Sequence, residues 1–177
     1  MNMKKVLILT HEDDPHSKSV CRYFDKVGVC YYEVLTDKLI EDYKLTFDLS
    51  RGIYTIDGSQ GSVDITRTSD WSIWNRRVMD PVVPEDIPAG LEDIVFTETA
   101  RTWEGLLFTH PGRVVNKPQS NFNANNKLYQ LLFVRDYGHG ISVPRTILTN
   151  NPNMLRAFYR STPRISFKLQ RAPIVQT

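Results

Sequence analysis

The stretch that decides the fold is KKVLILTHEDDPHSKSVCRYFDKVGVCYYEVL, residues 4–35. It begins with a short continuous apolar run, which is typical of a strand buried on both faces. Asp14 and Pro15 then have the residue types of a helix N-cap and a first helical residue, and Gly28 ends the helical pattern. A second apolar strand covers residues 29–35. This β-α-β order predicts a parallel sheet with a right-handed crossover.

The next part of the chain changes to the alternation typical of antiparallel strands. Residues 44–50 and 52–57 are separated by little more than a turn, and GSQG at 58–61 leads into a further strand at 63–66. This spacing predicts a small antiparallel β-ribbon. WSIWNRR at 71–77 predicts another strand by the same alternation. We therefore expect an α/β fold with a mainly parallel, doubly wound sheet and a β-ribbon insertion.

The rest of the chain is predicted to alternate helices with short extended segments. In chain order these are one or two helices up to residue 108, a strand at 113–116 that Pro118 ends, a helix containing Ala124 and Leu128 that Gly138 closes, an edge strand or linker at 141–148, a helix capped by Asn151, and a strand at 164–170. We expect residues 1–140 to form the first domain and residues 141–177 to begin a second, incomplete one.

The composition is that of an ordinary globular protein, with 177 residues of which 41% are hydrophobic and 24% charged. It excludes a disordered tail, a collagen-like fibre and a disulfide-dense miniprotein. A net charge of +2 gives no indication of a nucleic-acid or anionic-membrane partner. No segment approaches the roughly 18 apolar residues of a membrane span. We expect a cytoplasmic protein without nucleic-acid or membrane partners.

The charges are unevenly distributed. Residues 137–177 contain no Asp or Glu and six basic residues, which are Arg145, Arg156, Arg160, Arg164, Lys168 and Arg171. A metal site that needs carboxylates cannot be assembled from this tail. The sequence therefore predicts no metal site in this tail. We expect neither catalytic nor metal-binding residues in the chain.

The loop HEDDPH at 11–16 follows the first predicted strand, where open α/β sheets bind ligands. Asp13 and Asp14 are suited to capping the following helix, because carboxylates accept hydrogen bonds from its free amides. A substrate contact through residues such as His16, and a metal site, are the alternatives. The loop lacks the glycines of a phosphate-binding turn.

Two pairs of basic residues are further candidates. Arg76 and Arg77 end the predicted strand at 71–77, and adjacent strand residues point to opposite faces, so at most one faces a given cleft. An arginine can hold a carboxylate or phosphate with two hydrogen bonds, and surface salt bridges are the alternative. Lys127 begins a helix and Lys168 lies on the polar face of the last strand. Each lysine alone is typical of a solvated surface.

The run VVNKPQSNFNANNKLYQLLFVRDYGHGISVPRTILTNNPNMLRAFYRS, residues 114–161, resembles the junction of ATP-grasp ligases in the branch that macrocyclises ribosomal peptides. These graspetide synthetases include microviridin and marinostatin ligases and Bacteroidetes-type peptide maturases. In the branch, an Asn strand leads to a helix with Lys before Gln-Leu. A Gly-x-x-x-Pro-x-Thr segment, here 140–146, and a Thr-Asn-x-Pro helix start, here 149–152, complete the run. VLILT and the WNRR segment look like the branch's pre-ATP-grasp domain.

The resemblance implies a pre-ATP-grasp domain followed by the start of an ATP-grasp central domain. By the same resemblance, Lys127 and Lys168 contact ATP, and Arg76 or Arg77 either binds a peptide carboxylate or is structural. We expect Arg76, Arg77 and His16 as the substrate-binding residues. The family activates a side-chain carboxylate of a precursor peptide as an acyl phosphate, with Mg²⁺ neutralising the transferred group. A Ser/Thr hydroxyl or a Lys amine then closes an ester or amide ring. The precursor peptide is the partner that the resemblance implies, and we also expect a homodimer.

The chain departs from the family pattern after Lys168. Family members continue with a Gly-rich flap, whereas residues 169–173 here are LQRAP, and their Mg²⁺ ligands come from a later region. We therefore expect the N-terminal part of such a ligase, inactive by itself. One alternative is a non-catalytic peptide-binding or dimerisation module related to these ligases. Another is kinship to ribosomal-protein glutamate ligases, which would lack the Trp-x-Arg-Arg strand.

Overall fold

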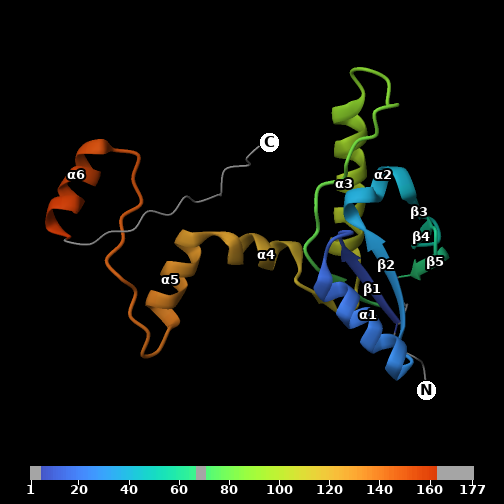
Figure 1. Cartoon of the computed structure of the whole chain (residues 1–177), viewed down its shortest axis with the longest axis horizontal. Coiled ribbons are helices and arrows are strands. Elements are labelled where there is room, and N and C mark those ends of the chain that lie inside the picture. Colours follow the sequence, from blue (N-terminus) through green and yellow to red (C-terminus); the bar gives the residue numbers. More distant parts are fainter. Residues whose placement is uncertain (1–4, 67–70, 163–177) are drawn as a thin grey trace. The chain divides into compact units, whose positions relative to one another are not determined.

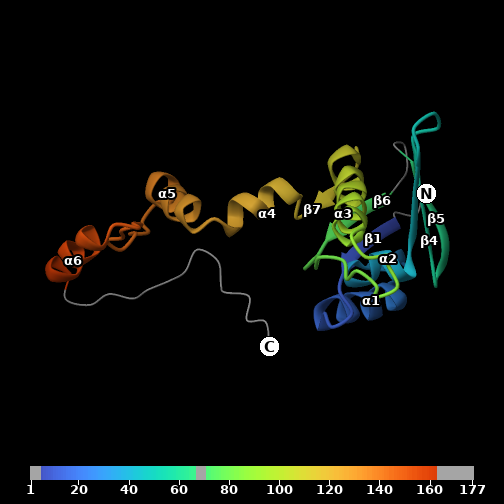
Figure 2. The same cartoon turned by 90° about the horizontal axis from the view of Figure 1, so that it is seen from above.

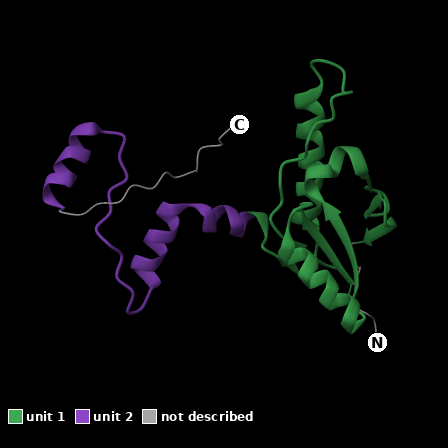
Figure 3. Cartoon of the chain, in the orientation of Figure 1, with its two compact units in different colours: residues 1–118 green, residues 119–177 purple. Residues whose placement is uncertain are grey.

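The computed structural model describes residues 5–66 and 71–162. The chain forms two compact units, residues 1–118 and residues 119–177 (Figure 3). The domain boundary expected near residue 140 stays a prediction. The predicted strand at 164–170, with Lys168, lies outside the described residues.

The β-α-β unit predicted at the N-terminus is confirmed. Strand β1 (Lys5–Thr10) leads into helix α1 (Pro15–Val27), and strand β2 (Cys30–Leu35) follows. Asp14 is the N-cap of α1 as predicted, since its side chain accepts a hydrogen bond from the His16 backbone N–H. Gly28 ends the helix in the left-handed conformation, with φ of 70°, which glycine adopts without steric cost.

Strands β6 (Trp71–Asn75) and β7 (Val114–Val115) complete a four-stranded parallel sheet in the order β2-β1-β6-β7. Helix α1 connects β1 to β2 on one side, and helix α3 (Glu92–Thr109) connects β6 to β7 on the other. Figure 2 shows α1 and α3 on opposite faces of the sheet. The predicted doubly wound arrangement is therefore confirmed.

The β-ribbon is also confirmed, as a three-stranded antiparallel sheet of β3 (Lys44–Asp48), β4 (Ile53–Gly58) and β5 (Gly61–Thr66) with β4 in the centre (Figure 1). The short helices η1 (Thr36–Lys38) and α2 (Leu39–Asp42) connect β2 to the ribbon. The sequence did not predict them, because two such short turns are too brief for a helical period to show.

The core of the first unit lies on the face of the parallel sheet that carries α3 and the ribbon. Pairing aligns Leu7 with Tyr32 and with Ile73, so these side chains share that face. The buried apolar residues of this cluster are Leu7, Leu9, Tyr32, Val34, Leu39, Tyr54, Ile56, Ile65, Trp71, Ile73, Trp103, Leu106, Leu107 and Val114. Ile8, fully buried, points to the opposite face by alternation. The strand is thus buried on both faces, as its continuous apolar run predicts.

Gly112 lies where the chain passes from α3 to β7 close to other backbone. A Cβ added there would lie 2.6 Å from His110 Nε2 and 2.9 Å from the Trp71 carbonyl oxygen. Gly112→Ala is expected to lower the free energy of unfolding by about 1–3 kcal/mol, measured by urea denaturation. Gly105→Ala in α3 is the control, because its Cβ would meet only Tyr54 Oη at 3.5 Å. It should leave stability unchanged or raise it. Equal losses in both variants would contradict this account of Gly112.

The second unit contains two helices where the sequence predicts one. Helix α4 (Pro118–Asn125) and helix α5 (Lys127–Tyr137) are separated at Asn126, whose side chain caps α5 by accepting a 2.9 Å hydrogen bond from the Tyr129 N–H. Pro118 begins a helix, since the fixed φ of proline suits a first helical position. The prediction of one helix through Ala124 and Leu128 was wrong, because Asn126 caps a new helix between these two residues.

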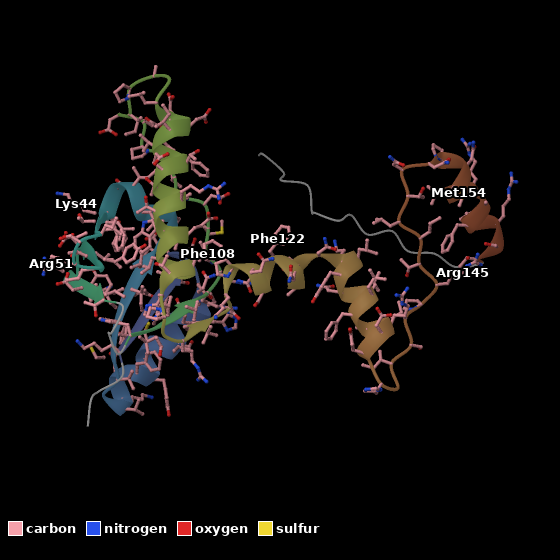
Figure 4. The ribbon with its side chains drawn as sticks, turned by 180° about the vertical axis from the view of Figure 1, so that it is seen from behind. Lys44, Arg51, Phe108, Phe122, Arg145 and Met154 are labelled. Atoms are coloured by element: carbon pink, nitrogen blue, oxygen red, sulfur yellow. The ribbon has the colours of Figure 1, made fainter. Side chains whose placement is uncertain are left out.

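The rest of the second unit is an extended segment and helix α6 (Pro152–Ser161). Residues 139–149 have no helix or strand apart from one turn, which agrees with the linker alternative. The guanidinium of Arg145, which Figure 4 labels, lies 5.2 Å from the centre of the Phe158 ring. Helices α4, α5 and α6 contain no buried side chain. Within residues 5–66 and 71–162, no helix is long and apolar enough to span a bilayer.

Candidate functional site

Polar side chains gather at the carboxyl ends of β1 and β6, the two central strands of the parallel sheet. The chain leaves β1 toward one edge of the sheet and leaves β6 toward the other. Open α/β sheets bind ligands at such a switch point. The loop at 11–16 follows β1, and Arg76 and Arg77 follow β6.

Asp14 is the centre of this cluster, and its side chain is fully buried. One carboxylate oxygen accepts a 3.1 Å hydrogen bond from the His16 N–H. The other accepts from the Thr10 hydroxyl at 3.2 Å and from Arg76 Nε at 3.2 Å. The Arg76 side chain is 26% exposed, and its other N–H groups form no hydrogen bond with the described residues. The pair thus fixes Arg76 by one nitrogen and leaves the outer edge of the guanidinium available.

The environment of Asp14 favours the ionised carboxylate. Burial raises the pKa of this carboxyl, but the His16 amide, the Thr10 hydroxyl and the charge of Arg76 outweigh burial, so the pKa lies below its ordinary value of 3.8. The charge of Asp14 in turn offsets that of Arg76 at the N-terminus of α1, where a lone cation is unfavourable. The cluster is therefore an ion pair at neutral pH.

The lowered pKa of Asp14 predicts a loss of stability in acid. A carboxyl whose pKa is lower in the folded than in the unfolded protein stabilises the fold at pH values above its unfolded pKa. For Asp14 this stabilisation is lost as the pH falls from 3.8, the ordinary value, through the lower pKa of the folded protein. Asp14→Asn should show a weaker fall in the free energy of unfolding across that window, measured by denaturant titration at each pH. Parallel curves for the two proteins would contradict the prediction.

The strand predicted at 71–77 ends two residues early, at Asn75. Arg77 has φ of 47° and is exposed, and Asn116, just after β7, has φ of 60°. The alternation argument for the two arginines was therefore wrong, because neither arginine belongs to the strand. Asn75 and Asn116 each donate a side-chain hydrogen bond to the other's carbonyl oxygen, at 2.8 and 3.2 Å. These bonds join the ends of β6 and β7 and hold the left-handed Asn116, and backbone strain of this kind commonly marks functional sites.

A further set of contacts at this edge was missed by sequence reasoning. The Thr36 hydroxyl accepts from the Met79 N–H at 2.9 Å, and the Asp37 carbonyl accepts from the Val82 N–H at 3.0 Å. Residues after β6 are thereby tied to the end of β2. Asp37 Oδ1 and Asn75 Oδ1 are buried and accept no hydrogen bond from the described residues. In the sequence, these contacts are indicated only by two polar residues, Thr36 and Asp37, directly after a predicted strand.

The other predicted site residues are distributed as follows. His16 contributes its backbone to the cluster, while its side chain is exposed on the first turn of α1. Lys127 is half-buried at the first position of α5, in the second unit. Of the loop at 11–16, Asp14 performs the capping role. Among residues 5–66 and 71–162, no three His, Cys, Asp or Glu side chains lie together as metal ligands.

Residues 5–121 match the family described as the MvdD pre-ATP grasp domain. The solved macrocyclase MdnB from Microcystis aeruginosa MRC is similar, with 26% identity, a TM-score of 0.75, and coverage of 89% of this chain and 51% of that one. A Chryseobacterium gregarium RiPP-associated ATP-grasp ligase, solved with ADP and a leader and core peptide, has 26% identity and a TM-score of 0.77 over 91% of this chain and 48% of that one.

Macrocyclase MdnC from Microcystis aeruginosa MRC, solved with its precursor peptide MdnA, has a TM-score of 0.77 over 89% of this chain and 51% of that one. At 20% identity it shows the fold alone. No curated protein matches. The chain thus spans about half the length of these solved relatives. The family match covers all four parallel strands together with Asp14, Arg76 and Arg77. The chain belongs to the MvdD pre-ATP-grasp domain family, found in the N-terminal portion of graspetide-type ligases.

Proposed function

We propose that this chain provides the pre-ATP-grasp part of an ATP-dependent ligase that macrocyclises a ribosomally made precursor peptide. The observation that carries the proposal is the family match over residues 5–121, which includes the whole parallel sheet and its polar edge. The two relatives at 26% identity support it, since one is a macrocyclase and the other an ATP-grasp ligase with a bound leader and core peptide. The ligase works in the cytoplasm, where ATP is plentiful.

Arg76, Arg77 and His16 are the proposed contacts to the peptide. Arg76 is oriented by Asp14 and presents its outer N–H groups, which suit a peptide carboxylate. Arg77 is exposed and forms no ion pair with the described residues, so its full charge is available. His16 adds an exposed imidazole on the first turn of α1. Together they form a basic edge suited to acidic side chains.

Lys127 and Lys168 are the proposed contacts to ATP. When bound, ATP supplies the phosphoryl group that activates a peptide carboxylate for attack by a hydroxyl or amine. The ammonium group of each lysine would offset the charge of the polyphosphate. Lys127 stands at the N-terminus of α5, whose free amides also favour an anion.

The proposal is tested by titrating the chain into a labelled precursor peptide from the same gene neighbourhood and recording fluorescence anisotropy. The chain is expected to bind the peptide, and Arg77→Ala is expected to weaken binding about fivefold to tenfold without changing stability. Lys26→Ala, an exposed cation at the far end of α1, is the matched control. Failure of the unaltered chain to bind any such peptide would contradict the proposal.

A homodimer is a separate part of the proposal. Sedimentation velocity over a range of protein concentrations would give the expected dimer. A single monomeric species at every concentration would remove this part and leave the peptide-binding role to be judged on the titration. If the protein encoded by the complete reading frame binds the precursor peptide but forms no ring in it, the result favours the alternative of a non-catalytic peptide-binding module.

A further inference from the structure

The first unit contains a groove that shares no residue with the Asp14–Arg76 cluster. Its volume is about 250 Å³, and it opens to solvent between α2, β3 and α3. It is lined by Leu39, Ile40, Tyr43, Leu45, Glu98, Thr99, Thr102 and Trp103. The indole of Trp103 and the side chain of Leu39 are almost fully buried beneath it. The groove therefore has an apolar floor within a polar rim.

The size of the groove indicates what kind of group it holds. Pockets for whole small molecules and cofactors commonly measure about 300–1,000 Å³. A groove of 250 Å³ with an apolar floor is better suited to one or two bulky side chains of a larger partner. Thr99 and Thr102 from α3 supply hydroxyls at the rim, and neither is fully buried. The natural occupant is a segment of polypeptide.

The elements that line the groove carry more acidic than basic residues. Over their whole length α2, β3 and α3 have seven acidic residues and two basic ones, although several of these, such as Asp93, lie away from the lining. Of the two cations, Arg101 is held by Glu104 at 2.7 Å, while Lys44 stands at the first position of β3 (Figure 4). Glu98 lies on the lining itself and forms no ion pair with the described residues. The rim thus complements a basic partner.

Tyr43 forms part of the groove wall, and its hydroxyl accepts a 3.1 Å hydrogen bond from the Leu35 N–H at the end of β2. Burial raises the pKa of this phenol, the hydrogen bond opposes the rise, and the carboxylates of Asp42, Glu33 and Asp37 raise the pKa further. The phenol is therefore neutral at neutral pH, and its ring adds to the apolar part of the groove wall.

Strand β3 gives the occupant its conformation. Among the described strands β3 pairs only with β4, so its other edge is open. Leu45 belongs to β3 and also lines the groove. Extended peptides add to open sheet edges through backbone hydrogen bonds and place alternate side chains into neighbouring pockets. A peptide beside β3 would direct every second side chain toward the face of Leu45.

We propose that this groove, with the edge of β3, binds an extended peptide segment in which bulky apolar residues alternate with Lys or Arg. The apolar side chains occupy the floor over Trp103, and a basic side chain pairs with Glu98. That the segment belongs to the precursor peptide rests on the proposed function. The groove would then recognise a part of the peptide distinct from the part at the basic edge of Arg76 and Arg77.

The test uses three short labelled peptides with the 177-residue chain, followed by fluorescence anisotropy. One peptide alternates Lys with Leu, one alternates Lys with Ser, and one alternates Glu with Leu. The Lys-Leu peptide is expected to bind about tenfold or more tightly than either of the others, because it has both the charge and the apolar side chains. Equal binding of the Lys-Ser peptide would mean attraction by charge alone and would overturn the proposal.

Two variants locate the binding. Thr102→Phe fills the groove from an exposed position, and Glu98→Lys reverses the charge of its rim. Each is expected to weaken binding of the Lys-Leu peptide about tenfold. The matched controls on α3 are Thr97→Phe and Asp93→Lys, which are exposed and lie outside the lining. Thermal unfolding confirms that all four variants fold. Unchanged binding in both groove variants would overturn the proposal.

The outcome separates the groove from the proposed function. If the precursor peptide binds and Thr102→Phe has no effect on it or on the Lys-Leu peptide, the ligase role stands and the groove is overturned. If the Lys-Leu peptide binds through the groove but no precursor does, the groove stands and the ligase role fails. Sedimentation of each variant without peptide tests a third outcome. If Thr102→Phe changes the sedimentation and Thr97→Phe does not, the groove binds a second copy of the chain, and the peptide proposal is overturned.

Discussion

Replacing Arg76 by alanine is expected to lower the free energy of unfolding by about 2–3 kcal/mol. The variant leaves the fully buried Asp14 carboxylate without its cation, although the Thr10 hydroxyl and the His16 amide remain. The 26% exposure of Arg76 lets solvent screen part of the pair, so the loss lies below that of a completely buried ion pair. Urea denaturation at neutral pH measures the difference.

Arg77→Ala is the matched control for Arg76→Ala. Arg77 is exposed and adjacent in sequence, and its replacement should change the free energy of unfolding by less than about 0.5 kcal/mol. Adding Asp14→Asn to Arg76→Ala should recover part of the loss, because the buried charge is then absent. Equal effects of the two arginine variants, or no recovery in the double variant, would contradict the role assigned to Asp14.

Replacing Lys127 or Lys168 by alanine is expected to lower the rate of ring formation about 10²-fold or more in the complete reading frame. Each variant removes a cation proposed to face the polyphosphate. Mass spectrometry of the precursor peptide over time gives the rate. Lys117→Ala, an exposed lysine just before α4, is the control and should retain the rate. Loss of folding in either lysine variant, seen by circular dichroism, would mean that the lysine is structural.

The parallel sheet could be predicted because its signals are local. The apolar run of β1, the Asp14-Pro15 cap and Gly28 are each readable within a few residues. Right-handed crossover and parallel pairing then follow from the order of the elements. The antiparallel ribbon was predictable for the same reason, since alternation and short turns are local features.

The arrangement at the polar edge could not be predicted because it depends on distant parts of the chain. Arg76 and Asp14 are 62 residues apart, and Asn75 and Asn116 are 41 apart. Nothing near Arg76 in the sequence shows that Asp14 will bind it. The left-handed φ of Arg77 is likewise set by the contacts around it, because an arginine has no local preference for that conformation.

The split between α4 and α5 shows a different limit. Asn126 has a strong tendency to cap a helix, but the asparagines before it have the same tendency. The sequence alone offers several equivalent cap positions within NFNANN, and the structure selects the last of them. The start of α5 at Lys127 was nevertheless predicted, so the position of this candidate ATP contact on its helix is confirmed.

The most direct test of the proposed ligase is co-expression of the complete reading frame that encodes this chain with the gene for a neighbouring precursor peptide. Intact-mass spectrometry of the recovered peptide measures the reaction. Ring closure by ester or amide formation is expected to remove the mass of one water for each ring, with the change absent from Lys127→Ala. An unmodified peptide, recovered with folded protein that binds neither the peptide nor Mg-ATP in isothermal titration, would contradict the ligase function.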